Sequence, residues 1–116
     1  MPYPACLNAD YLDSLLEALG RETLADAFDT YRRTTAEALI RLRSELAAGQ
    51  AEPSRRTAHF IASGSASIGA LAAASLARSL EHLPLDAPAA TVADLVTRLA
   101  SAVAECEAAL AAILRP

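Results

Sequence analysis

Residues 22–48, ETLADAFDTYRRTTAEALIRLRSELAA, decide the fold class of this 116-residue chain. Apolar and small residues recur along the stretch at spacings of four and three, which is the period of one face of an α-helix. The residues on that face are Leu24, Phe28, Tyr31, Thr35, Leu39, Leu42 and Leu46. Because Gly49 follows and glycine commonly ends a helix, the sequence predicts one long amphipathic helix from about Glu22 to Ala48.

Two more helices are indicated by start and stop signals on either side of this stretch. A short helix starts after Asn8, a favourable N-cap residue, and ends at Gly20. A long one opens at Pro53, which suits the first turn of a helix, and continues to about Leu83, where Pro84 closes it. We expect this third segment to be one continuous helix.

A fourth helix follows Asp86 and Pro88 and carries a single apolar seam. The seam contains Val92, Leu95, Leu99, Val103, Cys106, Leu110 and Ile113, so Cys106 is expected to be a small core residue. Alanine, the best helix former, accounts for 29 of the 116 residues, whereas aromatic residues, which strands favour, make up only 4%. The chain is therefore expected to be all-α, an antiparallel four-helix bundle with a short N-terminal helical segment.

Length and composition exclude several classes of protein. The chain has the size of one domain, which we take as residues 1–116 with a core of about 8–114. A formal net charge of −4 argues against binding to nucleic acid. Residues 57–77 carry no formal charge but consist mostly of Ala, Ser and Gly, which favours a soluble helix over a membrane span. Two cysteines are too few for a disulfide scaffold and the first residues lack a secretion signal, so we expect a cytoplasmic protein.

Both histidines of the chain, His59 and His82, fall in the third helical segment. On a helical wheel the apolar residues of this segment gather at about 180–260° from His59. His59 is therefore expected to point to solvent, either as a functional group or as an ordinary surface histidine. His82 lies roughly 35 Å farther along a continuous helix, so one metal ion is not expected to join the two rings. Near a helix C-terminus, His82 is expected to interact with the helix dipole.

Small side chains follow His59 along its own side of the helix. They are Ser63, Ala66, Ala70, Ala73 and Ala77. An exposed helix face normally carries long charged residues, so this face leaves room for another protein to approach the imidazole. The alternative is that the alanines only support helix formation in an alanine-rich chain.

An exposed imidazole is largely neutral near pH 7 and is able to attack phosphorus as a nucleophile. Arg55 and Arg56 lie one turn before His59, where they are expected to stabilise the added negative charge. Ser63 is small, and its hydroxyl is available to the imidazole or to its own helix backbone. The alternative role for the two arginines is to be solvated or to pair with Glu52.

The run AHFIASGSASIGA at residues 58–70, with Leu76 and Leu80-Glu81 farther on, resembles the motif of the histidine-containing phosphotransfer (HPt) domain family. In that family an apolar residue stands two places after the histidine, Lys-Gly-Ser typically follows, and Leu-Gly-Ala and a closing Leu-Glu come later. Together with Phe28 and the end of the long second helix, the resemblance covers roughly residues 8–114.

Two positions depart from the family pattern. The third residue after the histidine, typically lysine, is Ala62, and the fourth, typically glycine, is Ser63, with Gly64 one place later. The resemblance leaves open whether Arg55 or Arg56 replaces the missing lysine.

The resemblance implies a phosphocarrier rather than an enzyme. His59 is expected to accept a phosphoryl group from an aspartate of one receiver domain and to pass it to another receiver in a two-component phosphorelay. The implied partners are receiver domains of a hybrid histidine kinase and of response regulators, with no nucleic acid and no membrane. The residues expected to line the partner-binding face are Ala62, Gly64, Ala66, Ala70 and Ala73. No cofactor or metal is expected on this chain, and Mg²⁺ is expected on the partner receiver.

Two other functions remain open from the sequence. One is a receiver-binding adaptor with weak or no phosphotransfer, which Ala62 in place of the lysine suggests. The other is a structural helical bundle that oligomerises through the alanine stripe.

Overall fold

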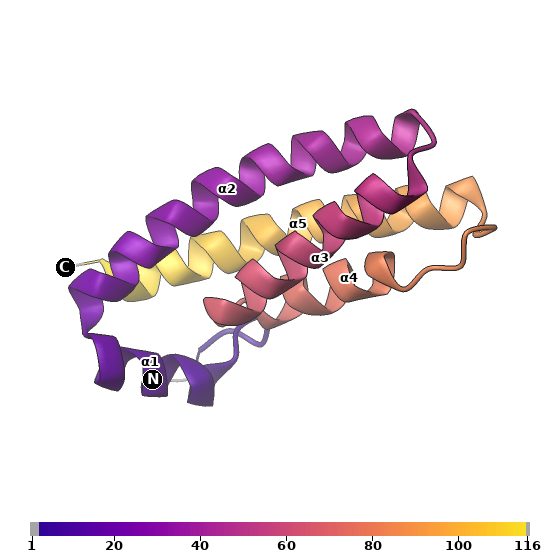
Figure 1. Ribbon diagram of the computed structural model, residues 1–116. Helices are drawn as coiled ribbons and strands as arrows, with labels where there is room; N and C mark the ends of the chain where they lie inside the picture. Colours follow the sequence, from indigo (N-terminus) through magenta and orange to yellow (C-terminus); the bar gives the residue numbers. More distant parts are fainter. Residues whose placement is uncertain (1–2, 116) are drawn as a thin grey trace.

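The computed structural model describes residues 3–115, and every regular element within that range is a helix (Figure 1). The helices are α1 (Ala9–Leu19), α2 (Arg21–Ala47), α3 (Ala51–Ser67), α4 (Leu71–Glu81) and α5 (Ala89–Leu114). Helices α2 to α5 form an antiparallel bundle, and α1 lies at the end where α2 begins and α5 ends. The predicted all-α fold with a four-helix bundle is confirmed. Met1, Pro2 and Pro116 of the predicted domain lie outside the described residues.

The helix ends follow the local signals of the sequence. Asn8 caps α1, because its side-chain oxygen accepts a hydrogen bond of 3.2 Å from the backbone N–H of Tyr11. Gly20 and Gly49 separate α1 from α2 and α2 from α3 with backbone φ angles of +81° and +70°. Glycine adopts this left-handed conformation without steric cost, which explains why both helices stop where they do.

The third predicted segment is wrong as a continuous helix, since α3 and α4 are separated at Gly69. Gly69 has a φ of +81°, and its N–H donates to the carbonyl of Ala66 at 3.2 Å. The N–H of Ala70 donates to the carbonyl of Ser65 at 2.8 Å. These two bonds form a Schellman motif, which ends α3 and reverses the chain. Helix α4 therefore runs back antiparallel to α3 (Figure 1).

The reversal changes the environment of the alanine stripe. Ala70, Ala73 and Ala77, which the sequence places on an exposed face, are each 0% exposed. Because α4 folds back against the bundle, these methyl groups lie inside it. The predicted exposure of this part of the stripe is therefore wrong, and the accessible face beside His59 ends near the Gly69 turn.

Two polar contacts fasten α2 to α3. The hydroxyls of Tyr31 and Ser65 lie 2.8 Å apart in the core, and the Thr57 hydroxyl donates to the Glu45 carboxylate at 2.6 Å. Burial raises the pKa of Tyr31 to about 12, so this phenol stays protonated well above neutral pH. The largest fully buried apolar side chains around these contacts are Leu12, Leu24, Leu42, Ile61, Leu99 and Leu110.

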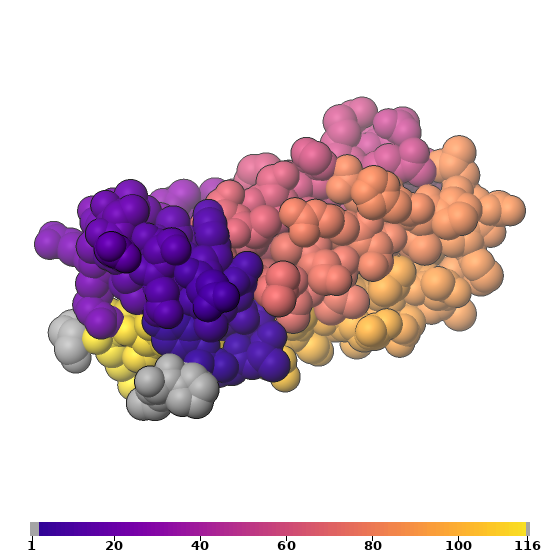
Figure 2. All heavy atoms as spheres, turned by 90° about the horizontal axis from the view of Figure 1, so that it is seen from below, coloured from indigo at the N-terminus to yellow at the C-terminus, as the bar shows by residue number. Residues whose placement is uncertain are grey.

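The segment before α1 closes the end of the bundle. The backbone N–H of Asn8 donates to the Gly69 carbonyl at 2.9 Å, and the Cys6 carbonyl accepts from Ala72 at 3.0 Å. The Tyr11 hydroxyl donates to the Ser67 carbonyl at 3.2 Å. In Figure 2 this N-terminal part, in indigo and violet, covers one end of the molecule beside the start of α4. The N-terminal segment therefore supports the turn between α3 and α4.

Among residues 3–115, no helix has the combination of length and hydropathy that a bilayer-spanning segment requires.

Candidate functional site

His59 lies in the middle of α3 with its imidazole directed to solvent. Its side chain is 65% exposed, whereas Ala58 and Ile61 beside it are each 1% exposed. The helical period explains the contrast, because residues on the opposite side of α3 face α2 and α4. The predicted orientation of His59 is confirmed.

Glu81, the last residue of α4, holds the imidazole from one side. Its Oε2 lies 2.7 Å from Nδ1 of His59, and its side chain is only 18% exposed. When Nδ1–H donates a hydrogen bond to the carboxylate of Glu81, the other nitrogen of the neutral ring, Nε2, keeps its lone pair. The contact thus favours the tautomer that has its proton on Nδ1 and its lone pair on Nε2. A continuous third helix would have put Glu81 far from His59, so only the reversal at Gly69 creates this pair.

The register of α3 against α4 follows from this contact and two others. Arg55 contacts the Leu83 carbonyl toward one end of the pair, and Ala66, Ala74 and Arg78 line one hollow toward the other end. Helices α3 and α4 are antiparallel, so three residues forward from His59 correspond to three residues back from Glu81. We therefore infer that Arg78 is level with position 62 of α3, about 4.5 Å along the axis from His59. Arg78 is exposed, and its side chain makes no hydrogen bond or ion pair with residues 3–115. Sequence reasoning missed this cation because it treated α3 and α4 as one helix.

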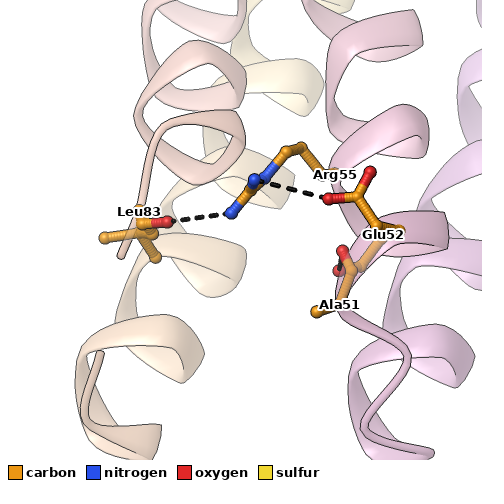
Figure 3. A network of polar contacts seen from close by, with 5 residues as sticks. Ala51, Glu52, Arg55 and Leu83 are labelled. Carbon is orange, nitrogen blue, oxygen red and sulfur yellow. Dashed lines mark hydrogen bonds and ion pairs between the residues drawn. The ribbon is translucent and has the colours of Figure 1, made fainter. Parts of the chain in front are cut away.

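Arg55 is held by other groups (Figure 3). One guanidinium nitrogen lies 3.5 Å from the Glu52 carboxylate, and another donates to the Leu83 carbonyl at 3.4 Å. The alternative role, pairing with Glu52, is therefore what the structure has, and Arg55 joins α3 to the segment after α4. Arg56 is exposed and lines a hollow with Arg41 and Phe60.

The predicted partner-binding residues divide into two groups. Gly64 and Ala66 are half-buried and flank Ser63 along α3, and Ser63 is exposed. Ala62 is 2% exposed, and Ala70 and Ala73 are 0% exposed. These three alanines cannot touch a partner's surface in this fold, so their assignment to the docking face is wrong. The face is shorter than predicted and is confined to α3 and its flanks.

Phe60 is a second residue that sequence reasoning missed. Its side chain is 46% exposed, next to His59, and the guanidinium carbon of Arg41 lies 6.0 Å from the ring centroid. Phe60 also borders a groove between α2 and α3. The residues lining this groove are Ala27, Thr30, Tyr31, Thr34, Thr35, Phe60, Gly64, Ser67 and Ile68. The available signal was the helical wheel, on which Phe60 falls outside the buried arc of the segment.

The distance inferred between the two histidines is also wrong. His82 directly follows Glu81, whose carboxylate touches His59, so the two histidines do not lie roughly 35 Å apart as on a single helix. No group of three or more His, Cys, Asp or Glu side chains that could hold a metal ion occurs among residues 3–115.

Comparisons with known proteins agree with this geometry. Residues 26–114 match the Hpt domain family. The chain is similar to the crystal structure of histidine-containing phosphotransfer protein B (HptB) from Pseudomonas aeruginosa PAO1, with a TM-score of 0.84 and 25% sequence identity. This similarity covers 95% of each chain. A search of curated proteins found no match. Because the family match spans most of the chain, the protein belongs to the Hpt domain family, whose members are phosphocarriers in two-component signalling.

Proposed function

We propose that the protein is a phosphorelay intermediate in which Nε2 of His59 carries the phosphoryl group. The observation that carries this proposal is the pairing of an exposed imidazole with a partly buried carboxylate, His59 with Glu81 at 2.7 Å. In the neutral ring with its proton on Nδ1, Nε2 carries the lone pair that a nucleophile needs.

The transfer itself needs little from this chain beyond positioning. The lone pair of Nε2 forms the N–P bond as the O–P bond of the receiver's aspartyl phosphate breaks, and the aspartate leaves as a carboxylate. The proton on Nδ1 stays in place, so the phosphorylated ring carries positive charge. The Glu81 carboxylate stabilises that charge, and return of the phosphoryl group to a second receiver reverses the same step.

Charge around the phosphoryl group comes from exposed arginines. Arg78 on α4 supplies the positive charge of the lysine that is replaced by Ala62, because the backbone of Arg78 is level with position 62. Arg56 approaches from the N-terminal side of His59. Arg55, engaged with Glu52 and Leu83, is left out of this role. Ser63 contributes a small side chain that keeps the exposed face open.

The partners are receiver domains, one from a hybrid histidine kinase and others from response regulators. They dock over His59, Phe60 and the half-buried Gly64 and Ala66, where no long side chain of α3 stands in the way. Mg²⁺ comes with the receiver, whose acidic site and aspartate meet the arginines around His59. The protein acts as a carrier in this scheme.

Phosphotransfer profiling tests the proposal. The chain is incubated with a panel of receiver domains that have been phosphorylated in the presence of Mg²⁺. We expect an acid-labile, base-stable label on the wild type and on a His82→Ala control, and no label on His59→Ala, with unchanged helicity in all three. Receiver binding without label across the panel would instead indicate an adaptor. Absence of receiver binding together with a stable oligomer would indicate a structural bundle.

A further inference from the structure

The chain has only two cysteines, and the fold brings them together from positions 100 residues apart. Cys6 precedes α1, and Cys106 lies in α5. The Cys106 thiol donates a hydrogen bond of 3.4 Å to the Cys6 carbonyl, so the sulfur of Cys106 lies against the backbone of Cys6. Two cysteines whose residues touch in this way meet the first requirement for a disulfide, which is proximity.

The two thiols differ in their access to solvent. Cys106 is 0% exposed, and burial raises its pKa to about 11, so it remains protonated at neutral pH. Cys6 is only half-buried, in a segment that has solvent on one side. An oxidant dissolved in water therefore reaches Cys6 first, and the buried Cys106 is available to react with oxidised Cys6.

We propose that Cys6 and Cys106 form a reversible intramolecular disulfide when the protein meets a peroxide. The Cys6 thiolate attacks an oxygen of hydrogen peroxide, the O–O bond breaks, and Cys6 becomes a sulfenic acid with release of water after protonation. The sulfur of Cys106 then attacks the sulfenic sulfur, a second water leaves with the Cys106 proton, and the S–S bond is formed. Two thiols are oxidised and one peroxide is reduced to two waters.

The disulfide ties the N-terminal segment to the body of the bundle. The same segment supports the α3–α4 turn, through the bonds from Asn8 to Gly69 and from Ala72 to Cys6. A covalent link across most of the chain length removes many conformations of the unfolded state. The oxidised protein is therefore more resistant to unfolding than the reduced protein. This inference stands on the two thiols alone and does not depend on phosphotransfer by His59.

Oxidation of the full-length protein with hydrogen peroxide, followed by mass spectrometry, tests the proposal. We expect a monomer lighter by two hydrogen atoms, with no thiol left to alkylate and full reversal by a thiol reductant. Tryptic cleavage after arginine under non-reducing conditions should yield the peptides 1–21 and 99–116 joined together, because the Arg115–Pro116 bond resists trypsin. The melting temperature of the oxidised form should be higher by roughly 10 °C.

The single variants Cys6→Ser and Cys106→Ala serve as matched controls, because each keeps one thiol and neither is able to form the internal link. Both should lose the joined peptide and the difference in melting temperature between oxidised and reduced protein. Three results overturn the proposal: disulfide-linked dimers in place of the internal link, terminal oxidation of Cys6 with Cys106 still free, or an internal disulfide that lowers the melting temperature.

Discussion

The backbone of Gly69 lies against the side chain of Leu12, so that a Cβ at position 69 would be only 2.8 Å from Leu12 Cγ. Leu12 is itself 0% exposed, which leaves it little freedom to move away. Helix α1 thus packs directly on the turn between α3 and α4. That turn sets how α4 is aligned along α3, and therefore whether Glu81, at the end of α4, reaches His59.

Gly69→Ala is expected to destabilise the fold by roughly 2–4 kcal/mol, from the left-handed backbone and from the clash with Leu12 together. Gly49→Ala is the matched control, because Gly49 also has a positive φ but has nothing within 4 Å of the added Cβ. It should cost about 1 kcal/mol. Urea denaturation measures both free energies of unfolding. Equal losses at the two sites would show that contact with Leu12 does not matter.

Glu81→Gln is expected to slow phosphotransfer about tenfold, because a neutral amide does not stabilise the positive ring that forms on phosphorylation. The change leaves the receiver-binding surface of α3 intact, so receiver affinity should stay the same. Glu37→Gln, an exposed carboxylate on α2, is the control and should transfer at the wild-type rate. A Glu81→Gln protein that also transfers at the wild-type rate would remove Glu81 from the mechanism.

Arg78→Gln is expected to slow phosphotransfer about fivefold, the size of effect that one partly exposed ion pair with a phosphoryl group provides. Arg55→Gln should leave the rate unchanged, since its guanidinium is engaged with Glu52 and Leu83. Single-turnover transfer from a phosphorylated receiver distinguishes the two variants. If Arg55→Gln proved the slower one, Arg55 would be the cation that replaces the lysine missing at Ala62.

Ala66→Arg is expected to weaken receiver binding at least tenfold while far-UV circular dichroism stays that of the wild type, because Ala66 is half-buried beside the accessible face. Ala70→Arg behaves differently, since position 70 is 0% exposed and an arginine there unfolds the protein. Calorimetric titration with a receiver and thermal melts separate the two effects. Full receiver affinity in Ala66→Arg would move the docking face elsewhere.

Alkaline pH should weaken the fold through Tyr31. Its pKa is raised from 10.0 to about 12 by burial, so the unfolded chain releases this proton first and stability is lost as pH rises from about 10 toward 12. By about pH 11.5 the loss attributable to Tyr31 is about 2 kcal/mol. Tyr31→Phe lacks the ionisable phenol and should lose less stability over the same interval in urea denaturation. Parallel losses in the two proteins would assign the alkaline effect to other groups.

The sequence was sufficient for features that depend on local signals and on periodicity. The amphipathic pattern of α2, the Asn8 cap and the direction of the His59 side chain all follow from interactions within one helix. The family motif around His59 added the expected chemistry, and the Hpt domain match supports that resemblance.

The sequence failed where a single residue reverses the chain. The apolar seam of the third segment continues through Gly69, so its helical period gave no sign of the reversal, although a glycine there fits a helix C-terminus. Everything that depends on the α3–α4 hairpin was consequently missed: the Glu81 contact, the position of Arg78 and the burial of Ala73. These are tertiary relationships, and a wheel drawn for one straight helix places them on the wrong face.

The buried alanines of α3 and α4 have a consequence for the imidazole of His59. Ala58, Ala62, Ala73 and Ala77 are almost completely buried, and side chains of this volume set how near two helix axes are able to come. They act as spacers, whose thickness determines whether a carboxylate on one helix reaches a ring on the other. Replacing one of these buried alanines with a larger apolar residue would therefore disturb the contact between Glu81 and His59, although the new side chain would touch neither the imidazole nor a partner.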